Sequence, residues 1–209
     1  MARSTRLGTR GQAHTLEAFV AAVLLVAGLT FALQATAVTP LSASTSNQHI
    51  ENQQRAVATD ILETSAANGD LREALLYWDP GNESRDPGFV GTQPDLTYHT
   101  VGGPPNDFGE TLDRAFLESR IAFNVDVRYH VEGGQQTQQM VFMGTPSDNA
   151  VTASRTVPVS NDTTLTAPDF ATRSLSDVES ATDEAFYAPG VGDGPTYNYL
   201  EVRIVVWRM

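Results

Sequence analysis

The chain has 209 residues, no cysteine and a formal net charge of -12, and all 13 of its basic residues are arginines. So large an acidic excess repels nucleic acid and anionic lipid head groups, which argues against either as an electrostatic partner. Without cysteine there are no disulfides and no thiolate metal sites, so stability must come from core burial.

The acidic, lysine-free composition also indicates the solvent in which the protein works. At about 1 M salt the Debye length falls to about 3 Å, which removes the self-repulsion of an acidic surface. The composition therefore predicts a protein of an extreme halophile, and we expect a haloarchaeon. An acidic protein encoded by a high-GC genome is the alternative.

The first predicted element is an apolar helix near the N-terminus. From Ala18 to Val38 the chain has no charged residue, and a helix of about 20 residues spans about 30 Å, the thickness of a bilayer's hydrocarbon core. We take the membrane helix as residues 13–38, after a basic leader at 1–12. The arginines of that leader (Arg3, Arg6 and Arg10) place the N-terminus in the cytoplasm and the rest of the chain outside the cell, as a single-pass protein of the cell membrane.

The start of this helix carries a short motif. Gly11 and Gln12 are followed by Thr15, by Glu17 and then by the unbroken apolar run. This arrangement resembles the signal of type IV pilins, in particular the archaeal class III signal with its Gln-x-Ser-x-Glu pattern. Here Thr15 stands about where that family has serine, and the resemblance covers only about residues 10–38.

The resemblance implies processing and assembly. A prepilin-type peptidase would remove the leader near Gly11, Gln12 and Ala13, and the retained helix would serve as lipid anchor and as the core of a homo-oligomer or pilus-type filament. In that family a glutamate at the fifth mature position pairs with the new amino terminus of a neighbouring subunit. Cleavage after Gln12 would make Glu17 the fifth residue, and cleavage after Gly11 would make it the sixth.

Two other interpretations of the same segment stay open. Residues 35–37 form an Ala-x-Ala tripeptide, the signature of ordinary signal peptidase, and cleavage after Ala37 would release the remainder as a secreted protein. Glu17 could also lie simply among lipid head groups, in a single-span surface domain that binds a partner and never polymerises.

The exported part is predicted to be an α+β domain. After a loosening at Pro40 and residues 42–47, an amphipathic stalk helix covers residues 39–69, with Ile50, Val57, Ile61 and Leu62 on one face and its end at Asn68-Gly69. The domain then covers residues 70–209. Capping-box spacings predict short helices from Asp70 to Trp78 and from Asp107 to about Arg120.

Alternating apolar and polar residues predict the strands of this domain. We expect them at residues 96–101, 121–131, 138–144, 150–159 and 199–207, with a hairpin turn at Gly133-Gly134. Short turns between strands favour a four- or five-stranded antiparallel sheet covered by short helices. Residues 160–194 are expected to form a long surface excursion, with a short helix at 177–186.

Few residues suggest chemistry on the exported side. Asn82 and Asn161 each begin an Asn-x-Ser/Thr tripeptide and are candidate N-glycosylation sites. The four histidines lie at 14, 49, 99 and 130, without the spacing of a zinc site, so we assign no catalytic, cofactor or metal residue and do not expect an enzyme.

Overall fold

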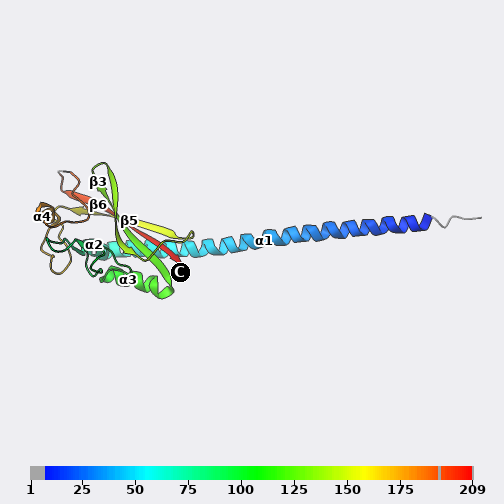
Figure 1. The fold of residues 1–209 in the computed structure, drawn as a ribbon, viewed down its shortest axis with the longest axis horizontal. Helices are drawn as coiled ribbons and strands as arrows, with labels where there is room; N and C mark the ends of the chain where they lie inside the picture. The colour runs from blue at the N-terminus through cyan, green and yellow to red at the C-terminus, as the bar shows by residue number, and fades with distance from the viewer. Residues whose placement is uncertain (1–7, 193, 209) are drawn as a thin grey trace, which may run out of the picture. The chain divides into compact units, whose positions relative to one another are not determined.

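The computed structural model describes the backbone of residues 8–192 and 194–208, with side chains described at 13–34, 48–192 and 194–208. The chain divides into two compact units, the first ending at Ile50 and the second beginning at Glu51. The fold is α+β as expected: a long N-terminal helix is followed by short helices and antiparallel strands (Figure 1).

The first helix, α1, runs from Gly8 to Asn68 as one continuous element. The loosening expected at Pro40 is absent from its backbone. A proline inside a helix removes one hydrogen bond and bends the axis, but the turns on either side keep their own bonds, so the helix continues. The predicted end at Asn68 is confirmed, because Gly69 takes the left-handed conformation (φ 96°) and its N–H donates to the Ser65 carbonyl at 3.1 Å.

The last turns of α1 are part of the folded domain rather than a separate stalk. Ala58, Ile61 and Leu62 are buried in the main hydrophobic core, and Val57 packs against it. The apolar face expected from helical spacing is therefore confirmed. The compact unit begins at Glu51, so it includes turns of α1 that the predicted stalk at residues 39–69 kept apart from the domain at 70–209.

The next helix, α2 (Asp70–Leu76), begins without the predicted capping box. Its N-cap residue is Gly69, which has no side chain to accept a hydrogen bond, so Asp70 lies in the first turn instead. The helix also ends before Trp78, which belongs to the short strand β1 (Trp78–Asp79) and pairs with β2 (Gly88–Phe89). The Trp78 ring meets the Phe89 ring edge-on at 5.0 Å and fixes this small hairpin.

The strand expected at residues 96–101 does not form. Only His99 pairs there, donating its N–H to the Met140 carbonyl and accepting from the Phe142 N–H. These two hydrogen bonds make His99 an isolated bridge rather than part of a strand, because the chain bends on either side of it and the ladder does not continue.

The helix predicted from Asp107 forms as α3 (Asp107–Ala115), with a different cap. Asn106, one residue earlier, accepts the Gly109 N–H at 3.1 Å, so the Asp107–Glu110 capping box is wrong. The helix also stops short of Arg120. A 3₁₀ turn, η1 (Leu117–Ser119), replaces its last part, and Arg120 closes that turn in the left-handed conformation (φ 57°).

The main sheet has four antiparallel strands in the order β4-β3-β6-β5. They are β3 (Ile121–Val131), β4 (Gly134–Phe142), β5 (Val151–Ser160) and β6 (Thr196–Arg208). The predicted hairpin is confirmed with its turn one residue earlier, since Gly134 already pairs with Val131. β6 starts before the predicted Tyr199, and β4 starts before the predicted Gln138, because polar residues extend both strands beyond their apolar patterns.

One face of the sheet forms the main core with the helices. From β6 it receives four fully buried side chains, from Leu200, Val202, Ile204 and Val206. From α3 and the turn after it come Phe108, Leu112 and Phe116. The opposite face is polar along most of its length, but Ala122, Val205 and Trp207 form a small second cluster at one end of it.

The surface excursion predicted at residues 160–194 also contributes to the core. The helix α4 (Leu175–Ser180) begins earlier and ends earlier than residues 177–186, because Ser174 and Asp177 form a capping box that fixes its start. Leu165, Leu175 and Val178 are buried in the main core. The segment therefore covers the core as well as facing solvent.

Candidate functional site

The apolar stretch of α1, residues 13–34, exposes its side chains instead of burying them in a core. The 22 residues Ala13–Gln34 contain an 18-residue stretch whose mean hydropathy is 2.3, and none of that stretch is buried. By length and composition it can cross a membrane, although the signal sequence of a secreted protein has the same properties. The large apolar side chains exposed along it are those of Leu16, Phe19, Val20, Val23, Leu24, Leu25, Val26, Leu29, Phe31 and Leu33.

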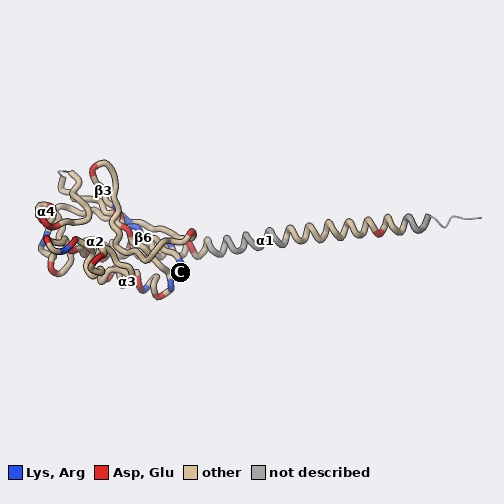
Figure 2. Tube along the Cα trace, viewed as in Figure 1, with Lys and Arg blue, Asp and Glu red and all other residues tan. Residues whose placement is uncertain are grey.

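Glu17 is the one acidic residue of this stretch (Figure 2). Its carboxylate is 82% exposed, and its Oε2 lies 3.7 Å from Nδ1 of His14, one turn earlier on the same helix. An exposed pair of this kind contributes little to stability in water. In an apolar bundle of helices, however, a carboxylate needs a positive partner, and among the described residues of its own helix the ring of His14 is the one in contact with it.

Sequence reasoning assigned Glu17 a role but missed His14 as its neighbour. The signal was present, because residues three apart share one face of a helix. The predicted cleavage residues Gly11, Gln12 and Ala13 all lie within the α1 backbone. The side chains of Gly11 and Gln12, like those of the tripeptide at 35–37, lie outside the described residues.

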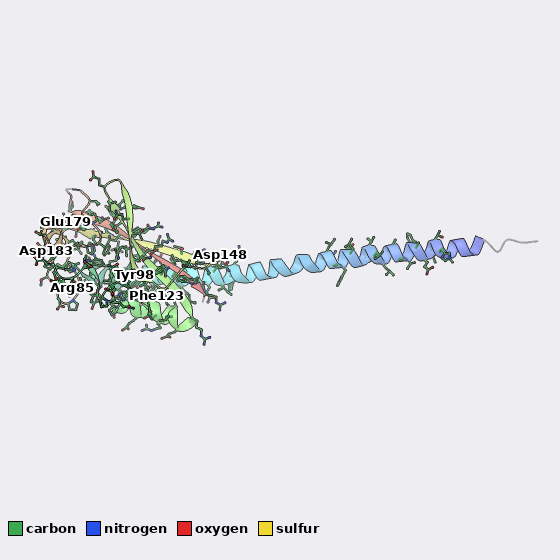
Figure 3. The ribbon with its side chains drawn as sticks, in the orientation of Figure 1. Arg85, Tyr98, Phe123, Asp148, Glu179 and Asp183 are labelled. Carbon is green, nitrogen blue, oxygen red and sulfur yellow. The ribbon has the colours of Figure 1, made fainter. Side chains whose placement is uncertain are left out.

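The first glycosylation candidate, Asn82, stands in a tight exposed turn between β1 and β2. Its backbone N–H donates to the Arg85 carbonyl at 2.9 Å, and the Arg85 N–H donates back to the Asn82 carbonyl at 3.1 Å. Its side-chain Oδ1 accepts the Ser84 N–H at 2.9 Å, which makes an Asx turn. Below the turn, Arg85 forms an ion pair with Asp79 at 2.6 Å, and Arg85 lies at the periphery of the domain (Figure 3).

The second candidate, Asn161, is a connector between segments. Its Nδ2 donates to the Gly194 carbonyl at 3.0 Å, and its backbone N–H donates to the Pro195 carbonyl at 3.2 Å. Its own carbonyl accepts the Ser176 N–H at 3.1 Å. The sequence alone made Asn82 and Asn161 equal candidates for glycosylation. In the fold they differ, because the amide nitrogen of Asn161 is hydrogen-bonded to another segment.

Two histidines of the domain lie in different environments. His99 is buried, and its Nε2 has no hydrogen-bond partner among the described residues. Burial lowers the pKa of His99, and the Asp113 carboxylate opposes that shift. His130 is exposed on β3, where its ring nitrogen lies 3.3 Å from Gln135 Nε2. Within the described residues no three His, Asp or Glu side chains come close enough together to hold a metal ion.

The polar face of the sheet carries cross-strand charge pairs that the sequence analysis did not single out. Arg128 on β3 lies opposite Glu201 on β6, with 3.9 Å between Nη1 and Oε2. Asp126 lies opposite Arg203 in the neighbouring row. Burial raises the pKa of Asp126, and the Arg203 and Arg128 guanidinium groups oppose that rise. These rows neutralise one another, which suits a structural role in holding β3 to β6.

Comparison with known proteins places the chain in a family. Residues 10–206 match the model of a "Family of unknown function (DUF7288)", and the chain therefore belongs to that family. No curated protein and no solved structure matches it.

Proposed function

We propose that this member of a family of unknown function is an exported cell-surface protein, held in the membrane by the apolar stretch of α1 and processed and assembled like an archaeal type IV pilin. The observation that carries the proposal is the exposure of Ala13–Gln34, which contains an 18-residue stretch of mean hydropathy 2.3 with none of its residues buried. Water does not tolerate so long an apolar surface, so lipid or other apolar helices must cover it.

The position of Glu17 supports assembly over simple anchoring. A carboxylate near the middle of a bilayer costs about 2.5–3.5 kcal/mol, and less near the interface, so an acid at the edge of a span is best kept beside a cation. Removal of the leader would create an amino group within one helical turn of Glu17, if the new terminus is Ala13. In a bundle of such helices, the amino groups and carboxylates of neighbouring subunits can neutralise one another.

The folded domain supports a structural rather than a catalytic task. Its charged rows are paired across strands, and its aromatic side chains pack on one another in the core. Trp78 illustrates this, since its ring packs on Tyr187 and its Nε1 donates to the Ala185 carbonyl at 2.8 Å. These contacts support a structural task for the domain that the proposed membrane helix would display at the cell surface.

The N-terminus of the protein isolated from its native membranes tests this proposal. N-terminal sequencing should find a new terminus at Gln12 or Ala13. A terminus at Val38 with the domain free in the medium would show ordinary secretion, and an uncut terminus would show a plain single-span anchor; either result contradicts the pilin-like proposal.

A substitution tests the role of Glu17 separately. Glu17→Gln should reduce recovery of high-molecular-mass assemblies from the cell surface while leaving the domain folded. Glu63→Gln is the matched control, because Glu63 is also an exposed acid of α1 but lies within the domain. Equal assembly of both variants would show that the Glu17 charge has no part in subunit contacts.

A further inference from the structure

An N-linked glycan makes specific demands on its acceptor. The side-chain Nδ2 of asparagine forms a bond to the anomeric carbon of a sugar, and the bond between that carbon and a lipid-linked phosphate or diphosphate breaks. One amide proton leaves with the lipid phosphate carrier as the leaving group. The acceptor must therefore present a free Nδ2, a free hydroxyl two residues later and room for a sugar outside the fold.

The turn at Asn82 meets these demands. Asn82, Glu83 and Ser84 are all exposed, and no hydrogen bond of Asn82 Nδ2 is found among the described residues. The Asx turn uses only the amide oxygen, which accepts the Ser84 N–H at 2.9 Å. The oxygen is therefore held in place, and no group among the described residues competes for the nitrogen.

The base below this turn is fixed, so the exposed tip is displayed in one arrangement. Gly81 has φ 78°, and a Cβ at that position would lie 2.7 Å from the Arg85 carbonyl oxygen, so only glycine fits there. The Gly81 N–H donates to Asp79 Oδ1 at 2.9 Å, while Asp79 Oδ2 pairs with Arg85. No side chain of residues 82–84 enters the core, so a sugar at the tip displaces nothing.

The turn at Asn161 fails the same demands. Asn161 is half-buried, its Nδ2 already bonds the Gly194 carbonyl, and a sugar on this nitrogen would have to fit against that segment. The hydroxyl two residues later is also in use, since Thr163 Oγ1 accepts the Ser160 N–H at 3.0 Å and lies 3.0 Å from Ser160 Oγ. Modification there would separate segments that hold the 161–195 region on the core.

We propose that Asn82 is an N-glycan acceptor of this protein and that Asn161 is not. The sugar would stand on the tip of the β1–β2 turn, and Asn161 would serve the fold as a hydrogen-bonded connector. This inference rests on the proposed export of the domain, because glycan transfer of this kind takes place on the outer side of the membrane.

Arginine-specific digestion of the protein from its native membranes tests the inference, because it separates the two sites. Cleavage after Arg72 and Arg85 releases Asn82 in one peptide, and cleavage after Arg155 and Arg173 releases Asn161 in another. Mass spectrometry should find glycan mass on the first peptide and none on the second. Asn82→Gln and Ser84→Ala should each abolish the glycan, and Ser84→Thr should retain it.

The matched variant Asn161→Gln should keep the glycan on the first peptide and lower the melting temperature of the domain, since it misplaces the amide that bonds Gly194. Glycan on the second peptide, on both peptides or on neither would overturn the inference. Protease treatment of intact cells separates these results from a failure of export: a digestible domain with a bare Asn82 refutes the acceptor and leaves the proposed function standing.

Discussion

Two stretches of the same helix place their apolar residues in opposite surroundings. In residues 13–34 the large apolar side chains are exposed, as with Leu25 at 75%. In residues 51–68 the apolar side chains follow one face, and Leu62 on that face is 1% exposed. The difference lies in pattern, because a helix that is apolar all round needs an apolar solvent, whereas an apolar stripe needs only one packed surface. Each stretch should therefore respond to a different kind of mutation.

The largest effect on folding should come from the buried stripe. Leu62→Ala should lower the free energy of unfolding by about 2–5 kcal/mol, because it removes core contacts and leaves a cavity. Leu25→Ala is the matched control and should leave the unfolding of the domain unchanged. Denaturant titration in detergent, followed by fluorescence of the two buried tryptophans, Trp78 and Trp207, measures both. Equal losses would show that the two stretches do not differ in the proposed way.

A charge in the exposed stretch should produce the reverse result. Leu25→Arg should reduce retention in the membrane fraction, because an arginine near the centre of a span costs about 2.5–3.5 kcal/mol on insertion. The unfolding midpoint of the domain should stay the same. Leu25→Ile controls for the change of side chain, and retention of the arginine variant at the original level would contradict a bilayer position for this residue.

The stability of the folded domain, unlike that of residues 13–34, should depend on pH through one buried histidine, His99. The pKa of His99 is lowered in the fold because its ring is buried, so the unfolded chain binds the proton more readily. The stability of the domain with a neutral His99 is therefore fully present above pH 6.5, the ordinary pKa of histidine. It is lost as the pH falls below that value, because the unfolded chain then takes up the proton first. Melting temperatures across pH 5–8 should show the loss.

Two variants separate this effect from general acid sensitivity. His99→Gln should flatten the pH dependence, and His130→Gln, which changes an exposed histidine of the same domain, should leave it in place. A pH profile that is the same in all three proteins would remove His99 as its cause.

The smallest expected effect compares two threonines with the same local contact. Thr30 Oγ1 donates to the Val26 carbonyl at 2.7 Å, and Thr59 Oγ1 donates to the Arg55 carbonyl at 2.9 Å, each four residues back along α1. Thr59→Ala should change the free energy of unfolding by less than about 0.5 kcal/mol, and Thr30→Ala should not change it at all. Calorimetry of the two variants in detergent measures the difference, and a loss of several kcal/mol in either would show a contact beyond the helix.

Regular patterns explain what the sequence could predict of this fold. The apolar run after Glu17, the stripe around Ile61 and the alternation in β3 and β6 all express a period that burial imposes on the chain. Short-range capping was harder to predict. Gly69 and Asn106 begin their helices one residue before the acids that carried the predicted capping boxes, because backbone conformation, rather than the spacing of acids, decides which residue is the cap.

Tertiary contacts account for the remaining differences. The alternation at 96–101 suggested a strand, but within that segment only His99 forms backbone hydrogen bonds with β4, and the pattern alone does not show whether a partner strand is available. The polar 161–195 segment carries few apolar residues, yet Leu165 and Leu175 fill the core. For the candidate sites, the sequence located Asn82 and Asn161 but not their contacts, since the bond from Asn161 to Gly194 joins residues far apart along the chain.

The position of β6 has a consequence for how the domain matures. This strand is the last of the four to leave the ribosome, yet it lies between β3 and β5 and pairs with both. The β3–β4 hairpin can form early, but β5 has no neighbour until Thr196 and the residues after it have emerged. The sheet is therefore completed only after its whole length has been synthesised, so β5 waits unpaired while the rest of the chain emerges.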